Sequence, residues 1–142
     1  MDSERIRSIL REVCGESGKS LHQSSDGECY ATVPADCLVQ VMEKLLHENL
    51  LHHLSAITAL DDGRSFSAYY HLWLAGGLTL RVSCPRENPV LPSVSKILPA
   101  ALWYEREAHD LFGILFEGHP ALEPLLVADE WDGPPPLLHK DD

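Results

Sequence analysis

Apolar residues near the start of the chain recur with helical spacing. At positions i, i+3, i+4 and i+7 stand Ile6, Ile9, Leu10 and Val13. This spacing places them on one face of a helix, and Gly15 follows the run as a common helix end. The pattern therefore predicts an amphipathic helix from Ser3 to Val13.

A short strand and a second helix follow. Residues 15–27 are rich in Gly and Ser and predict a loop, whereas residues 28–33 alternate polar and apolar side chains as a half-buried strand does. Pro34 suits the first turn of a helix, and the predicted helix extends to Asn49. Its apolar face consists of Leu38, Val41, Met42, Leu45 and Leu46. This helix is expected to pack on the sheet to which the strand belongs.

Three longer apolar segments predict an antiparallel meander. They span residues 54–60, 66–75 and 78–84. The Asp-Gly step at residues 62–63 supplies the positive φ of a tight hairpin turn, and Gly76-Gly77 supplies a second turn. The alternation along residues 65–75 leaves the sheet face away from the helices half apolar, so a partner or the Pro-rich segments are expected to cover it.

The last third of the chain contains a connection, a third helix and a tail. Residues 85–98 include three prolines and show no sustained period, which excludes a central strand there. Pro99 begins a helix that is predicted to end at Gly113. Helix and strand breakers then accumulate, and residues 121–142 are predicted to form an extended Pro-rich tail.

These elements define the expected fold class. Their order, α-β-α-β-β-β-α, predicts a two-layer α+β domain with a mostly antiparallel sheet and helices on one face. The domain is expected to comprise residues 1–120, followed by the tail. At 142 residues the chain is long enough for one hydrophobic core.

Composition narrows the classes of partner. Eleven basic and twenty-two acidic side chains give a net charge of −11, which disfavours nucleic acid and anionic lipid surfaces as partners. No apolar run approaches the roughly 20 residues of a membrane span, and the N-terminus lacks the layout of a signal peptide. A cytoplasmic protein without direct membrane insertion is expected. Four cysteines without a CxxC pair suit reduced thiols rather than disulfides or an iron-sulfur site.

The third helix carries charged and apolar side chains on the same surface. On a wheel of about 100° per residue, the flank expected to face the core contains Ala100, Ala101, Tyr104, Ala108, Leu111 and Phe112. The rest of the circumference holds Glu105, Arg106, Glu107, His109 and Asp110. Leu102 and Trp103 lie among these charges. Either this is a solvated face in which long charged stems share the surface with a Trp, or it is a partner interface with Trp103 as anchor and Arg106 as orienting charge.

Catalytic interpretations of the same helix are weaker. Glu105 and Glu107 are two positions apart and project about 160° to 200° from each other, so they cannot act together as an acid and a base. Glu105 and His109 share one helical face, and with His119 they form the ligand set of an alternative hypothesis, a free-standing metal-dependent enzyme. No phosphate-binding loop, GxSxG elbow or HExxH motif occurs in the sequence.

The segment from Trp103 to Pro120, WYEREAHDLFGILFEGHP, resembles the signature of the 30 kDa subunit family of NADH:quinone oxidoreductases, whose members are also called C subunits. That family includes the homologous subunit of membrane-bound nickel-iron hydrogenases and of formate hydrogenlyase-type complexes. The resemblance extends upstream through residues 92–94 and 69–72 and downstream through residues 125–126, Trp131 and Gly133. It covers most of the chain after about Leu50.

The resemblance implies a cofactor-free subunit, with no catalytic centre of its own, in the peripheral arm of a complex I-type assembly. It implies docking beside the large catalytic subunit and neighbouring iron-sulfur subunits, on the cytoplasmic side of the membrane, in support of electron transfer in a respiratory chain. The partner-interface residues that it implies are Trp103, Glu105, Arg106, Glu107, Asp110, Gly113, Gly118, His119 and Pro120.

Two details bear on the branch of the family. The Gly76-Gly77 turn and the Pro134-Pro135-Pro136-Leu137 segment look closer to the hydrogenase subunits than to the NADH:quinone oxidoreductase subunits. His139 occupies a position where the family usually has an arginine. A tail contact that needs a permanent positive charge is therefore not expected of this chain.

Overall fold

The computed structural model describes residues 3–15 and 21–120. The predicted tail, residues 121–142, lies outside the described residues, and so do its Pro-rich segment and His139. Part of the first predicted loop, residues 16–20, lies outside them as well.

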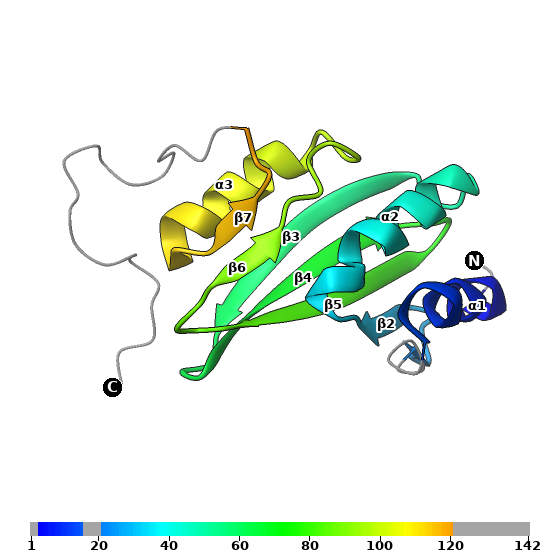
Figure 1. The fold of residues 1–142 in the computed structure, drawn as a ribbon. Helices are drawn as coiled ribbons and strands as arrows, with labels where there is room; N and C mark the ends of the chain where they lie inside the picture. The colour runs from blue at the N-terminus through cyan, green and yellow to red at the C-terminus, as the bar shows by residue number, and fades with distance from the viewer. Residues whose placement is uncertain (1–2, 16–20, 121–142) are drawn as a thin grey trace.

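A five-stranded sheet forms one layer of the fold, with the strand order β1-β2-β5-β4-β3. Its strands are β1 (His22–Gln23), β2 (Cys29–Thr32), β3 (His53–Asp61), β4 (Ser65–Trp73) and β5 (Gly77–Pro85). Strand β2 pairs with β5 in parallel, and every other neighbouring pair in this sheet is antiparallel. The predicted meander is thus confirmed as β3-β4-β5 (Figure 1).

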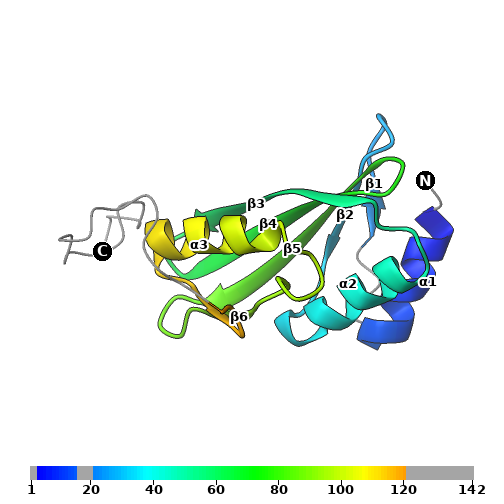
Figure 2. The same cartoon turned by 90° about the horizontal axis from the view of Figure 1, so that it is seen from above.

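The helices form the second layer. They are α1 (Ser3–Cys14), the 3₁₀ turn η2 (Ala35–Cys37), α2 (Leu38–His47) and α3 (Ala101–Phe112). Seen from above, α1, α2 and α3 all lie on the same side of the sheet (Figure 2). This arrangement confirms the predicted two-layer α+β class with helices on one face.

Alternation along the strands explains the position of the core. In β5, Leu78, Leu80 and Val82 are buried, while the residues between them are half-buried. Tyr70 in β4 is fully buried on the same side as Leu80, its partner in the strand register. Because strand side chains alternate between faces, these residues point toward the helices, and the helix layer closes the core over them.

The second helix differs in detail from the prediction. The chain after Pro34 begins with the 3₁₀ turn, and the α-helix ends at His47 rather than Asn49. Asn49 adopts a φ of 59°, a left-handed conformation that Asn tolerates better than most residues. The first helix agrees closely with its predicted bounds and is followed by Gly15, whose φ is 63°.

Two short strands outside the predicted order form a second, smaller sheet. Strand β6 (Val90–Pro92) pairs in parallel with β7 (Leu115–Glu117). The amide of Ser93 continues the pairing by donating to the carbonyl of Glu117 over 2.8 Å. This sheet fixes the chain after α3 beside the segment that precedes α3. No helix in the described part of the chain is long and apolar enough to cross a membrane.

Candidate functional site

Helix α3, where the sequence places most candidate residues, packs against β3. The Tyr104 hydroxyl donates to the carbonyl of Ser55 over 2.8 Å and ties the middle of the helix to that edge strand. The helix ends at Gly113, which has a φ of 79° and donates its amide to the His109 carbonyl over 2.8 Å. This left-handed glycine end agrees with the sequence prediction.

Glu105 does not lie on the exposed side of α3, where the helical wheel placed it. Its side chain is 0 % exposed. The Ser93 hydroxyl donates to Glu105 Oε1 over 2.6 Å, and the Val94 amide donates to Oε2 over 2.8 Å. Burial raises the pKa of the Glu105 carboxyl above its ordinary value, while the two hydrogen bonds act in the opposite direction.

The helical-wheel prediction was wrong for Glu105 because it assigned every charged side chain to the solvent-exposed side of the helix. Ala101, Glu105 and Ala108 lie on the buried face of α3, whereas Ala100, expected to be buried, is exposed. The hydrogen-bond donors that allow the carboxylate to be buried come from the segment before the helix. Helical periodicity contains no information about that segment.

The remaining charged candidates on α3 are only partly accessible. Asp110, also expected on the exposed side, is 7 % exposed. Arg106 and Glu107 are half-buried. The Arg106 Nε is buried and has no hydrogen-bond partner among the described residues. This guanidinium therefore retains hydrogen-bonding capacity at the edge of the helix.

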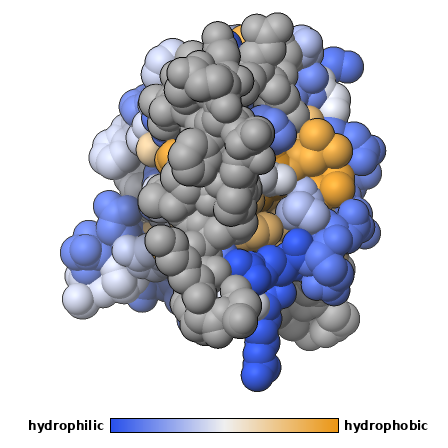
Figure 3. Space-filling view, turned by 90° about the vertical axis from the view of Figure 1, so that its left-hand side faces the viewer, coloured by the Kyte–Doolittle hydropathy of each residue, from blue (hydrophilic) through white to orange (hydrophobic). Residues whose placement is uncertain are grey.

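Apolar side chains project from α3 and β7 into solvent. Leu102 is 37 % exposed, Trp103 51 % and Leu115 46 %. The exposure of Leu102 and Trp103 is as predicted. Figure 3 shows a hydrophobic patch bordered by hydrophilic side chains at the end of the molecule where α3 ends, whereas Leu102 and Trp103 lie in the first turn of that helix. We call Leu102, Trp103 and the half-buried Arg106 beside them the α3 surface.

The turn that follows β7 folds back toward the start of α3. Gly118 has a φ of 95°, which permits the turn that the sequence predicted there. His119 Nε2 then lies 3.0 Å from the Leu102 carbonyl oxygen, and Pro120 is exposed. The predicted interface residues after the helix are thus brought beside Leu102 and Trp103.

The hypothesis of a metal site at Glu105, His109 and His119 is wrong. Glu105 bonds to the segment before the helix, whereas His109 Nδ1 lies 2.9 Å from the carbonyl oxygen of Ile114. The ring of His119 lies instead beside the Leu102 carbonyl. No group of three or more potential metal ligands occurs in residues 3–15 and 21–120. The three side chains do not converge on one point.

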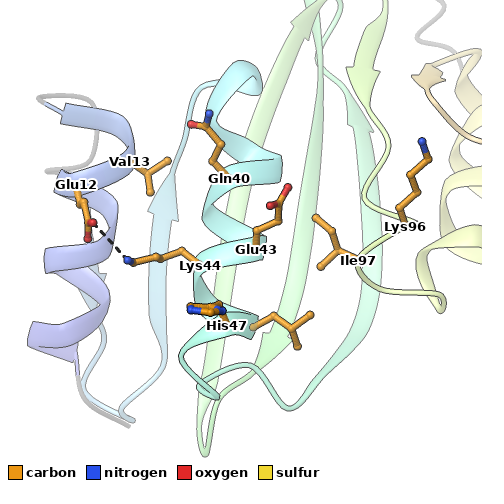
Figure 4. Close-up of a pocket in the computed structure, with 9 residues that line it drawn as sticks. Glu12, Val13, Gln40, Glu43, Lys44, His47, Lys96 and Ile97 are labelled. Carbon is orange, nitrogen blue, oxygen red and sulfur yellow. Dashed lines mark ion pairs between the residues drawn. The ribbon is translucent and has the colours of Figure 1, made fainter.

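A wide groove lies elsewhere, between α1, α2 and the segment before α3. Its volume is about 810 Å³, and it is lined by Glu12, Val13, Gln40, Glu43, Lys44, Leu46, His47, Lys96 and Ile97. Lys44 Nζ lies 3.4 Å from Glu12 Oε1 (Figure 4). It also lies 3.5 Å from Glu48 Oε2. No sequence pattern indicates this groove, because its lining comes from three separate segments. The two ion pairs of Lys44 are partly exposed and of small energetic value.

Comparison with known proteins shows which family this chain resembles in sequence. Residues 31–141 match the family described as respiratory-chain NADH dehydrogenase, 30 Kd subunit. The chain is 40 % identical to the C subunit of NADH-quinone oxidoreductase from Salinispora arenicola over 143 residues, which are 93 % of this chain and 58 % of that protein. It is 34 % identical to the C/D subunit of NADH-quinone oxidoreductase from Methylococcus capsulatus, covering 98 % of this chain and 26 % of that protein. The chain thus spans only part of these two relatives.

Solved structures with the same fold agree with the sequence matches. A trypsin-resistant fragment of Nqo5 has a TM-score of 0.71 and 28 % identity, and the match covers 86 % of this chain and all of that one. A chain of the membrane-bound sulfane sulfur reductase, an archaeal respiratory membrane complex, has a TM-score of 0.71 and 26 % identity. That match covers 90 % of this chain and 77 % of the other.

Proposed function

Because the chain belongs to the 30 kDa subunit family of respiratory-chain NADH dehydrogenases, we propose that it is a peripheral-arm subunit of a membrane-associated redox complex. In this proposal it has no redox cofactor and no catalytic centre of its own. It supports electron transfer by docking beside a large catalytic subunit, near iron-sulfur subunits, on the cytoplasmic side of the membrane.

The observation that carries this proposal is the α3 surface. Trp103 is about half exposed on a helix whose other face is buried, and Arg106 beside it keeps a buried Nε without a partner in the described residues. Tryptophan and arginine are among the side chains most often responsible for binding energy at protein interfaces. A tryptophan in water contributes little to folding, so an interface explains its position better than the core does.

The large subunit is the proposed partner of the α3 surface. The relative from Methylococcus capsulatus is named as a C/D subunit, and the present chain corresponds to 26 % of it. In that protein a C portion and a D portion are joined in one polypeptide. We infer that the separate counterpart of the D portion binds this chain, since covalent fusion keeps two partners at high effective concentration.

The electron donor and acceptor define two branches of the proposal. One is an NADH:quinone oxidoreductase, and the other is a membrane-bound nickel-iron hydrogenase. The similarity to a chain of a sulfane sulfur reductase supports a broad class of complex I-type assemblies. The α3 surface serves the same docking role in each branch.

The test is purification of the complex through an affinity tag on the full chain, with and without Trp103→Ala. We expect the unaltered chain to co-purify with a large metal-containing subunit. The variant should recover about tenfold less of it, because losing an anchor side chain costs about 1.4 kcal/mol of binding or more. The matched control is Leu46→Ala, an exposed leucine on α2, which should leave recovery unchanged.

Two results would contradict the proposed function. Full redox turnover by the isolated chain would make it an enzyme in its own right. Equal recovery of the large subunit by the Trp103→Ala variant and the unaltered chain would remove the α3 surface as the docking site. Thermal unfolding of the variant separates a loss of docking from a loss of folding, since an exposed tryptophan is not needed for the core.

A further inference from the structure

A second surface lies on the sheet face that points away from the helices. We call it the open face, and its centre consists of Tyr30, Tyr69, His71, Trp73, Thr79 and Arg81. Strand pairing places them together, since Tyr30 pairs with Thr79, Tyr69 with Arg81 and His71 with Thr79. No described helix covers this side of the sheet (Figure 2).

The charge of the open face differs from that of the rest of the molecule. The chain has 22 acidic residues and a net charge of −11, yet strands β2 to β5 contain one carboxylate, Asp61. The Asp61 side chain is 2 % exposed and lies 3.0 Å from Arg86. Two acids border the face: Glu28 holds its carboxylate against Gly77, the register partner of Trp73, and Asp62 lies in the β3-β4 turn. Between them, around His71 and Arg81, the strands contribute no carboxylate, and this part of the face is neutral to basic.

Arg81 has hydrogen-bonding capacity that the described residues do not use. Its guanidinium donates to Ser67 Oγ over 3.2 Å. Its Nε is buried and has no hydrogen-bond partner among the described residues. Together with Tyr30 and Tyr69, Arg81 lines a hollow of about 160 Å³. A carboxylate in this hollow would meet an arginine fork, the side chain best suited to it.

The rest of the open face combines exposed aromatic side chains with a histidine whose ring is fixed by hydrogen bonds. His71 is held between two hydroxyls, since its Nε2 lies 3.1 Å from Thr58 Oγ1 and its Nδ1 3.3 Å from Thr79 Oγ1. Tyr30 is 46 % exposed and Trp73 43 %. Exposed Tyr and Trp beside a half-buried Arg, with few carboxylates, are typical of the centre of a protein interface.

We propose that the open face binds an acidic segment of a neighbouring polypeptide. One carboxylate of that segment enters the hollow at Arg81, and an apolar side chain covers Trp73. Arg81 pairs with Tyr69, which precedes Trp73 by four residues in β4. The bound segment must therefore reach about 13 Å along the strand. A second copy of this chain does not fit, because its open face would bring arginine and histidine against the same side chains.

The identity of the neighbour rests on the proposed function, which places the chain among the subunits of a redox complex. The α3 surface and the open face belong to different layers of the fold. The chain would then lie between two polypeptides, with the helix layer toward the large subunit and the sheet toward the acidic segment.

The experiment is photo-cross-linking in the assembled complex, in its native membranes. The photoreactive amino acid p-benzoylphenylalanine replaces Trp73 in one full-length chain and Trp103 in another. We expect the probe at position 73 to attach to an acid-rich segment of another subunit, identified by mass spectrometry of the joined peptides. The probe at position 103 should attach to the large subunit.

The two probes separate the two proposals. Attachment from position 103 but none from position 73 overturns the open-face proposal and leaves the proposed function intact. The same conclusion follows if position 73 attaches only to a basic segment, to a second copy or to residues 121–142 of its own chain. Absence of attachment from both positions overturns both proposals.

Charge variants test the role assigned to Arg81. Arg81→Gln should lower cross-linking from position 73 about tenfold, and Arg81→Lys should lower it less, because the charge remains while the fork is lost. Arg64→Gln removes an exposed arginine from the β3-β4 turn and should have no effect. An unchanged yield in Arg81→Gln, with an unchanged unfolding temperature, overturns the proposal. If Arg81→Gln is unstable, Arg81→Lys becomes the test, and an unchanged cross-linking yield in that variant overturns the proposal.

Discussion

The carboxylate of Glu105 joins two parts of the chain that are otherwise separate. Its two oxygens accept hydrogen bonds from Ser93 and Val94, just after β6, while its backbone belongs to α3. The helix that presents Trp103 is thereby fixed to the second, smaller sheet. Glu105 acts on the proposed interface as a positioning residue and does not touch a partner itself.

Removing the Glu105 side chain is expected to destabilise the domain. Glu105→Ala leaves the Val94 amide unpaired in the core and creates a cavity, at a cost of about 2 to 4 kcal/mol. Glu105→Gln keeps one acceptor and the volume, so it should cost less. Urea unfolding measures both, with the exposed Glu117→Ala as the control. Equal stability of the alanine variant and the unaltered chain would contradict this assignment.

The raised pKa of Glu105 predicts a dependence of stability on pH. The folded-state pKa lies above the ordinary value of 4.5, so the folded chain binds the proton more tightly than the unfolded chain. This tighter proton binding adds to the free energy of unfolding. The added stability is fully present below pH 4.5 and is lost as the pH rises through the folded-state pKa. As the pH rises through this range, the unfolding free energy of the unaltered chain should fall relative to that of Glu105→Gln. A difference independent of pH would contradict it.

At the scale of elements, the ends of α3 determine where the interface side chains point. Gly113 reverses the chain in a left-handed conformation, and strand β7 then pairs with β6. This pairing carries Gly118 and His119 back to the first turn of the helix, where His119 meets the Leu102 carbonyl. The sequence motif is continuous, yet its two ends meet in space only because of this reversal.

Substitution of Gly113 tests that reversal. An alanine with a φ of 79° is strained by about 1 kcal/mol, so Gly113→Ala should lower the unfolding free energy by about that amount. Gly113→Asn should lower it less, because asparagine enters the left-handed region more easily. Chemical unfolding of the two variants provides the comparison. If alanine and asparagine have the same effect, the strain at this position is not the cause.

For the molecule as a whole, the described core closes within the first 120 residues. The described buried apolar residues run from Ile6 to Phe116 and form one cluster. The two surfaces proposed for partners, the α3 surface and the open face, are built on the two layers around that cluster. Each surface is rigid because the layer beneath it is packed.

Truncation tests whether residues 1–120 form the domain. A chain that ends at Pro120 should unfold cooperatively, because it retains every described core residue. A chain that ends at Phe112 loses Ile114 and Phe116, which are 0 % and 1 % exposed, and should be destabilised by several kcal/mol. Denaturant unfolding followed by circular dichroism distinguishes the two. Loss of cooperativity in the longer chain would show that the tail belongs to the domain.

Local sequence patterns were sufficient to predict the three helices and the β3-β4-β5 meander. Side chains three or four residues apart share a helix face, and alternate residues share a strand face. The motif from Trp103 to Pro120 also indicated the family and the exposure of Trp103 without any structure. Turns at Gly63 and Gly113 could be predicted for the same reason, because a positive φ is a property of one residue.

Contacts between distant segments, in contrast, could be learned only from the folded chain. The parallel pairing of β2 with β5, the pairing of β6 with β7 and the burial of Glu105 each depend on residues far away in sequence. A carboxylate on a helix is exposed or buried according to whether donors approach it from another segment. The open face likewise exists only once separate strands are placed side by side, because its centre is drawn from three of them.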